Sequence, residues 1–195
     1  MRHATLFHAT NKKGAEAVLD EKFVPHKISP ARMLSRDSST DKFYSQEVGS
    51  LGRGLYAFLD DKELAKLFWN KNNNSDECQI IKIDIKFDED NSLNFVDNLD
   101  DIAMFRTFLS NEKVQKIIKK FSEVYKNKYS QHELDGILIE YYINYFLIKK
   151  KIVTSIDCVF CATSTKLYKE FYTYVPNGIE YCIRSNSIIS GKELI

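Results

Sequence analysis

Three short segments carry side chains that could act together in one site. His8 lies in the apolar run 4–10, Tyr56 lies in the apolar run 55–59, and Glu180 interrupts an apolar run near the C-terminus. An imidazole and an aromatic ring can bind a ligand by hydrogen bonding and stacking, and a carboxylate can stabilise positive charge in a transition state. Such a set suits the cleavage of a glycosidic bond, in which positive charge develops on the sugar.

Each of these signals also has a purely structural explanation. A lone histidine on an apolar strand is more often a structural residue than a functional one. Gly52 and Gly54 permit close backbone approach, which a tight turn needs as much as a ligand does. This Gly-x-Gly lacks the third glycine and the βαβ context of a dinucleotide-binding fingerprint. Glu180 is costly on a buried face unless it is paired, but strand alternation also allows it to point to water.

The elements that must position these residues indicate a single α+β domain over residues 1–195. The segment 24–50 contains prolines and a Ser/Thr/Asp cluster, and we expect a long irregular loop there. Hydrophobic periodicity predicts the regular elements. The predicted strands are 4–10, 55–59, 79–87, 155–162 and 179–184, and the predicted helices are 13–23, 62–69, 98–110, 112–127 and 131–149. The last three helices form a helical block, at about residues 98–151, inserted between strands.

Charge and hydropathy narrow the function classes. The chain has 28 basic and 27 acidic residues, so no global charge favours nucleic acid or membrane binding. The lysine-rich segments 113–128 and 149–151 are expected to be solvated surface, and the alternative is a face for RNA or an acidic partner. No apolar run approaches the ~20 residues of a membrane span. The N-terminus has no signal-peptide pattern, so we expect a cytoplasmic protein with no membrane partner.

The four cysteines do not predict a metal site. Cys158 and Cys161 form one Cys-x-x-Cys pair, whereas Cys78 and Cys182 are isolated. A closed zinc site needs four ligands, usually supplied as two pairs. We therefore expect reduced cysteines in or near the core, and no metal.

Three motifs carry a resemblance to a known family. His8-Ala9-Thr10 resembles a His-Gly-Thr/Ser motif, residues 52–58 resemble a Gly-x-Gly-Ile-Tyr-Phe strand, and residues 180–183 resemble a Glu-Tyr-Val-Ile strand. In this order they resemble the H-Y-E class of ADP-ribosyltransferases, which includes diphtheria-toxin-like toxins and poly(ADP-ribose) polymerases. The motifs bracket residues 6–184, although the middle is unmatched. The resemblance implies a split β-sandwich whose cleft binds NAD in a bent form.

The resemblance also implies a role for each motif residue. His8 would hydrogen-bond a ribose, and the backbone of residue 9 would pair with the nicotinamide carboxamide. Tyr56 would stack on the nicotinamide ring. Glu180 would hold the ribose 2′-hydroxyl and stabilise the oxocarbenium-like ribose as nicotinamide leaves. The NAD-contacting positions carried over from the family are His8, Ala9, Thr10, Gly54, Leu55, Tyr56, Ala65 and Phe68.

Some positions depart from the family pattern. A second aromatic residue that often sandwiches the nicotinamide falls at Leu67, next to Phe68, which could replace it. A serine that often contacts the carboxamide falls at Leu64. Gly178 stands two residues before Glu180, where arginine-modifying members carry an acidic or amide residue. This departure argues against an arginine acceptor.

The function that the resemblance implies is an NAD-dependent mono-ADP-ribosyltransferase. We expect a bacterial toxin or defence effector that transfers ADP-ribose from NAD to nucleic acid or protein and releases nicotinamide. If it is the toxin of a toxin–antitoxin pair, a neutralising antitoxin or inhibitor protein is expected. The first alternative is an NAD glycohydrolase, in which water is the acceptor at the same site. The second is a catalytically inactive module that binds ADP-ribose or a peptide.

Overall fold

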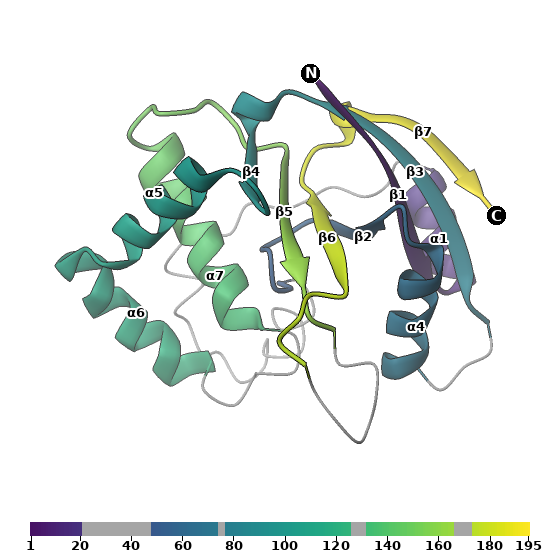
Figure 1. The fold of residues 1–195 in the computed structure, drawn as a ribbon, viewed down its shortest axis with the longest axis horizontal. Helices are drawn as coiled ribbons and strands as arrows, with labels where there is room; N and C mark the ends of the chain where they lie inside the picture. Colours follow the sequence, from purple (N-terminus) through teal and green to yellow (C-terminus); the bar gives the residue numbers. More distant parts are fainter. Residues whose placement is uncertain (21–47, 74–76, 126–131, 166–172) are drawn as a thin grey trace.

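The computed structural model describes residues 1–20, 48–73, 77–125, 132–165 and 173–195. These residues form an α+β fold with a seven-stranded mixed sheet in the order β4-β5-β6-β2-β1-β3-β7 (Figure 1). The strands are β1 (Arg2–Thr10), β2 (Leu55–Leu59), β3 (Gln79–Phe87), β4 (Ser92–Phe95), β5 (Cys158–Thr163), β6 (Gly178–Ile183) and β7 (Ile189–Leu194). The α-helices of the described part are α1 (Lys12–Leu19), α4 (Lys62–Asn72), α5 (Leu99–Leu109), α6 (Glu112–Tyr125) and α7 (Glu133–Tyr141), which continues as a π-helix over Tyr142–Ile148.

Local sequence explains where the helices begin. Asn11, Asp61 and Asn98 are the N-cap residues of α1, α4 and α5. The Asn11 side chain accepts a hydrogen bond from the backbone N–H of Gly14, and the other two side chains cap their helices in the same way. A side-chain oxygen at this position satisfies backbone N–H groups that have no partner inside the helix.

Most predicted elements are confirmed, with corrections at the edges. The strands predicted at 55–59 and 79–87 have the bounds of β2 and β3, and the three helices of the block are α5, α6 and α7. The prediction of a helix over 13–23 is wrong in its extent, because α1 ends at Leu19 with Asp20 as its C-cap. Strands β4 and β7 were not predicted. The expected loop 24–50 lies outside the described residues except for its last three positions.

The two arms of the sheet meet at a short junction. Strand β1 pairs with β2 at Leu6–Leu59 and Phe7–Phe58, whereas its other edge pairs with β3 from Arg2 to Thr10. One arm is therefore β4-β5-β6-β2 and the other is β1-β3-β7. This junction is the only part of the described sheet that joins the arms by backbone pairing.

The arms fold over and enclose the main core. The ring of Phe87 on β3 lies 5.9 Å from that of Phe160 on β5 and 6.4 Å from that of Tyr181 on β6. Strands β3 and β5 are four places apart, which in a flat sheet would separate them by about 19 Å. The sheet is therefore strongly curled, and its two arms pack on each other through Leu6, Ile81, Ile83, Phe87, Phe160, Tyr181 and Ile183.

Helices pack against the sheet on both sides of the molecule, and α1 packs Ala15 and Val18 into the main core. The block α5–α7 lies beside β4 and β5, and α1 and α4 lie at the other side of the molecule (Figure 1). The block buries Leu93, Val159 and Cys182 under the aromatic side chains of Phe108 and Tyr142. Helix α4 packs Leu64, Ala65 and Phe68 against Phe7 and Phe58 at the junction. None of the helices in the described ranges is both long and apolar enough to cross a membrane.

Candidate active site

The three motif strands are neighbours in the sheet, in the order β6-β2-β1. Cys182 lies opposite Tyr56, and Glu180 lies opposite Phe58. Directly opposite residues of an antiparallel pair point to the same face, and residues two apart on a strand share a face. The Tyr56 ring and the Glu180 carboxylate therefore point to the same face, on the side that α4 and the helical block cover.

The Glu180 carboxylate is nearly enclosed, at 8% exposure. The Ser50 hydroxyl donates a hydrogen bond to Glu180 Oε2 over 2.7 Å. Burial raises the pKa of Glu180, while the Ser50 hydrogen bond and the nearby charge of His132 act in the opposite direction. The site thus holds an oriented carboxylate in a dry environment, where its charge has a strong effect on a bound cation.

The Tyr56 ring is fixed by the loop 49–54 that precedes its strand. Its hydroxyl donates to the Gly52 carbonyl over 2.6 Å and accepts from the Leu51 N–H over 2.9 Å. Burial first, and then the nearby Cys182 and Glu180, raise the pKa of Tyr56 well above its usual value, so the hydroxyl stays protonated. Gly49 lies against the end of the ring, because a Cβ there would be 2.6 Å from Tyr56 Oη.

His8 lies at the point where β1 separates from β2. It pairs with Ile81 of β3 and alternates with Phe7 and Ala9, so its Cβ leaves the strand on the main-core face. Its ring reaches back to β2, and Nδ1 lies 2.6 Å from the Tyr56 carbonyl oxygen. Within the described residues, His8 and Glu180 share no hydrogen bond or ion pair.

The hydrogen bond of His8 settles which ring nitrogen carries the proton. A carbonyl oxygen only accepts, so Nδ1 must be the donor. Burial lowers the pKa of His8, and the bond to the Tyr56 carbonyl opposes that shift without cancelling it. The ring is therefore neutral at pH 7, and Nε2 is left as a hydrogen-bond acceptor.

The remaining predicted positions on β1 and α4 are mainly packing residues. Ala9 packs with Phe7 against the α4 cluster, where Ala65 is 1% exposed. The Phe68 ring packs on Phe58 with 5.6 Å between ring centroids. The Thr10 side chain covers the first turn of α1, because a Cβ at Gly14 would overlap it.

Glycines let the motif strands approach their neighbours closely. A Cβ at Gly54 would overlap the Cys182 sulfur and the Ile183 carbonyl, so β2 needs glycine there to reach β6. Leu55, the next predicted position, is buried in the main core. A Cβ at Gly178 would overlap the Leu64 side chain. The glycine two residues before Glu180 therefore has a packing explanation in addition to its interpretation through the acceptor.

A buried ion pair lies beside the loop 49–54 and was not predicted. Glu140 of α7 is 1% exposed and forms a two-pronged salt bridge with the guanidinium of Arg184, at the end of β6. Glu140 Oε1 also accepts from the Arg53 N–H over 2.8 Å, and Arg184 Nη1 donates to the Arg53 carbonyl over 3.2 Å. The Asn144 side chain donates to Glu140 Oε2 over 3.1 Å.

One feature of the sequence could have indicated the Glu140–Arg184 ion pair. Glu140 is the single charged residue in the run Ile137–Tyr142, and a carboxylate in an apolar helix segment needs a partner. Its partner could not be identified from the sequence, since Arg184 lies 44 residues further along the chain. Ser50 was likewise missed as a partner of Glu180, 130 residues away.

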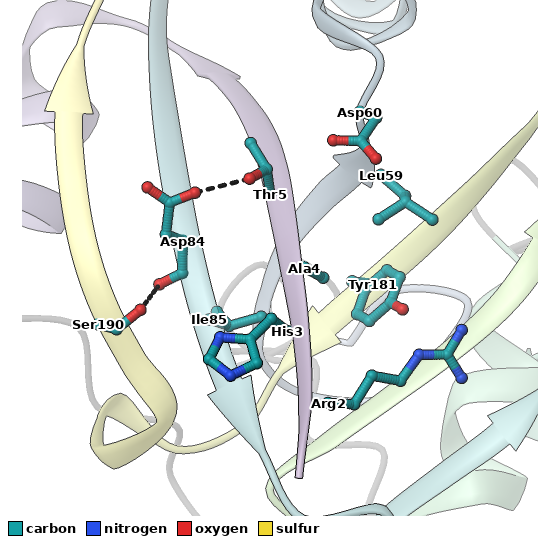
Figure 2. A pocket seen from close by; sticks show the side chains of 10 residues that line it. All are labelled: Arg2, His3, Ala4, Thr5, Leu59, Asp60, Asp84, Ile85, Tyr181 and Ser190. Carbon is teal, nitrogen blue, oxygen red and sulfur yellow. Dashed lines mark hydrogen bonds between the residues drawn. The ribbon is translucent and has the colours of Figure 1, made fainter.

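A separate cavity of about 510 Å³ lies at the opposite end of β1 from His8 (Figure 2). Figure 2 shows Asp84 and Ser190 on one side of β1, and Arg2 and Tyr181 on the other. Thr5 donates to the Asp84 carboxylate over 2.7 Å, and Ser190 donates to the Asp84 carbonyl over 3.0 Å. The described lining of this cavity contains none of the predicted site residues.

Three of the cysteines, Cys158, Cys161 and Cys182, pack in or against the core. All four are free thiols, and Cys158 and Cys182 are buried in the core, as predicted. Burial raises the pKa of Cys182 to about 12, so its thiol stays protonated. In the part of the chain that the structure describes, no group of three or more His, Cys, Asp or Glu side chains is arranged to hold a metal ion.

Comparisons with family models, curated proteins and solved structures found no significant match to this chain. Functional assignment therefore rests on the chain's own residues. The central geometric finding is that His8, Tyr56 and Glu180 lie on three adjacent strands, with Tyr56 between the other two.

Proposed function

We propose that the protein is an NAD-dependent mono-ADP-ribosyltransferase that releases nicotinamide and transfers ADP-ribose to a macromolecule. The observation that carries this proposal is the buried carboxylate of Glu180, oriented by Ser50 and on the same face as Tyr56. The three motif residues come from distant parts of the chain yet lie on adjacent strands, which supports the proposal.

The fold also supports this proposal. The sheet has two arms that meet at the short β1–β2 junction and pack on each other around the main core. Two such arms are compatible with the split β-sandwich that the resemblance implies, and α5–α7 would be its inserted helical block. His8 lies where the arms separate, which is where the cleft for NAD would open.

Glu180 would act on the ribose next to nicotinamide. As the bond between the ribose C1′ and the nicotinamide nitrogen breaks, its electron pair goes to the nicotinamide ring and positive charge develops on the ribose. A carboxylate fixed beside that charge, and accepting from the ribose 2′-hydroxyl, stabilises the transition state. Loss of such a stabiliser typically costs about 2.7–4 kcal/mol. An amide in place of Glu180 could keep the hydrogen bond and would lose the charge.

Tyr56 and His8 would bind the substrate. The nicotinamide ring of NAD is positively charged before cleavage, so the face of the Tyr56 ring attracts it by stacking and by a cation–π interaction. The unprotonated His8 Nε2 can accept a hydrogen bond from a ribose hydroxyl, since Nδ1 is committed to the Tyr56 carbonyl. The Tyr56 ring points to the same face as Glu180 and would hold the nicotinamide beside that carboxylate, whereas His8 would reach the substrate from the junction of the two arms.

The acceptor that we favour is a nucleic acid, with a protein as the alternative class. Lys113, Lys116, Lys119 and Lys120 of α6 are exposed, as are the lysines at 149–151. Exposed lysines on one block can bind phosphates without sequence specificity. If the protein is a toxin or defence effector, a neutralising protein partner would have to cover the same cleft.

Labelled NAD tests the proposal directly. The purified protein would be incubated with cell lysate and NAD that carries the label on its adenosine half, and RNA, DNA and protein fractions would be counted separately. Label in one macromolecular fraction, with equimolar nicotinamide, is the expected result. Free labelled ADP-ribose without any labelled macromolecule would instead favour the glycohydrolase, in which water is the acceptor. Absence of nicotinamide release would contradict both and favour an inactive binding module.

A further inference from the structure

We infer that the buried Glu140–Arg184 ion pair is a positioning device for the candidate active site. It holds the loop 49–54 against α7 and β6, and through this loop it fixes the Tyr56 ring and the Ser50 hydroxyl. The catalytic part of this inference rests on the proposed function. The structural part is that the ion pair holds the loop in place. It depends only on contacts within the protein and not on NAD.

Both members of the ion pair form hydrogen bonds with the backbone of the loop. The Arg53 N–H donates to Glu140 Oε1 over 2.8 Å, and the Arg53 carbonyl accepts from Arg184 Nη1 over 3.2 Å. Both backbone groups of one loop residue are thus committed to the two members of the pair. Next to it, Gly52 has a φ of 95°, and a Cβ there would lie 2.5 Å from Glu140 Oε1. The left-handed backbone and the close approach both require glycine at this position.

The same loop contacts the predicted catalytic side chains. The Tyr56 hydroxyl bonds to the Leu51 N–H and the Gly52 carbonyl. Ser50 donates to Glu180 over 2.7 Å. The chain of contacts therefore runs from α7, through the Arg53 backbone, to Tyr56, which would bind the nicotinamide ring, and to Glu180, which would act on the ribose. A loop displaced from α7 would release the Tyr56 hydroxyl and withdraw the hydroxyl that orients Glu180.

Helix α7 is shaped to receive the loop. Gly136 lies one turn before Glu140, and a Cβ there would overlap the Gly49 carbonyl. Beyond Glu140 the helix widens into the π-helix, where the Asn144 side chain bonds to both the Glu140 carbonyl and its carboxylate. The carboxylate is therefore held from its own helix while it holds the loop.

The pair contributes orientation that an apolar pair could not supply. Buried ion pairs often add little to stability compared with apolar side chains of similar size. Two leucines could fill much of the same space, but they could not bond to the Arg53 N–H and carbonyl. Replacing both members at once therefore separates positioning from folding, whereas removing one member leaves an unpaired charge in the core.

The decisive variant is Glu140→Leu/Arg184→Leu, studied by hydrogen–deuterium exchange and by steady-state kinetics with NAD. The expected result is a folded protein whose Tm falls by about 2–12 °C, because the Arg53 backbone groups lose these partners. Amide exchange in peptides covering residues 48–56 should rise at least about tenfold, and kcat/KM should fall by about 10–100-fold, as for other losses of alignment in a site. Val18→Ala is the matched control, because Val18 of α1 belongs to the main core cluster, which contains no residue of the loop 49–54.

A second variant keeps the proposal testable if the double variant does not fold. Arg184→Lys keeps the positive charge but loses the forked contact that reaches both Glu140 and the Arg53 carbonyl. Its loop exchange should lie between those of wild type and the double variant. The control Val18→Ala should lower Tm while its loop exchange and kcat/KM stay near wild type.

The outcomes separate the two proposals. A folded double variant with wild-type loop exchange would overturn the positioning role outright. Faster loop exchange with unchanged kcat/KM would overturn the catalytic consequence of that role. If wild type itself releases no nicotinamide, the proposed function fails, and loop exchange in the same variants still decides whether the ion pair holds the loop.

Discussion

At the scale of single residues, Glu180 illustrates a conflict between stability and function. Its carboxylate is 8% exposed and has the Ser50 hydroxyl as a partner on one oxygen. Burial raises its pKa, which means that the fold holds the ionised form less well than water does. A carboxylate kept in such a place is typical of a functional site rather than of a structural ion pair.

This conflict predicts a stability difference that depends on pH. The pKa of Glu180 is raised in the folded state, so its protonation favours folding at low pH, and that contribution is lost as pH rises through the raised pKa. Glu180→Gln cannot ionise and should gain stability relative to wild type as pH rises from about 4 to 8. Urea denaturation across this range measures the difference. A difference that is constant with pH would show that burial does not penalise the carboxylate.

The Tyr56 hydroxyl should matter for the loop more than for substrate stacking. Tyr56→Phe keeps the ring and removes the bonds to Leu51 and Gly52, leaving two backbone groups without that partner. The expected cost is about 1–3 kcal/mol of unfolding free energy. Tyr56→Leu removes the stacking ring as well and should reduce kcat/KM further. Equal kcat/KM for both variants would argue against ring stacking.

The sequence could nominate candidate residues but not the side chains that contact them. His8, Tyr56 and Glu180 could be proposed because their motifs are short and contiguous. Ser50 and Arg184 were not, because each acts through a side-chain contact with a residue far away in the chain. Such contacts depend on how the elements pack, and local patterns do not encode that.

At the scale of elements, α7 and the loop 49–54 approach each other so closely that position 136 has no room for a Cβ. Gly136→Ala should raise intrinsic helix propensity, but its Cβ would meet the Gly49 carbonyl, a backbone atom that cannot rotate away. Overlap of this kind typically costs about 1–3 kcal/mol. Gly191→Ala on β7 is the matched control, because its Cβ would lie 3.5 Å from its nearest neighbour, Asp84. Thermal unfolding should show a lower Tm for the first variant only.

Element predictions succeeded where the hydrophobic pattern was strong. Strand β3 alternates apolar and polar residues over its length, and its bounds were predicted correctly. Strand β4 has only four residues, and the edge strand β7 contains Gly191, Lys192 and Glu193 among few apolar positions. Their pairing with β5 and β3 stabilises them as strands despite a weak local pattern.

At the scale of the whole molecule, the candidate site is assembled from distant parts of one fold. Strand β1 supplies His8, the loop and β2 supply Ser50 and Tyr56, and β6 supplies Glu180. The helical block holds the loop through Glu140. The α+β class and the block could be predicted from the sequence, whereas the curl of the sheet and the ion pair depend on packing between distant segments.

The central claim is that this site cleaves the nicotinamide–ribose bond of NAD, with Glu180 stabilising the transition state. The most direct measurement is nicotinamide released from NAD by purified wild type and by Glu180→Gln, quantified by chromatography at pH 7.5. We expect release by wild type and a rate about 10²–10³-fold lower for the variant, with both proteins folded by circular dichroism. Equal rates for the two proteins, or no release by wild type, would contradict the claim.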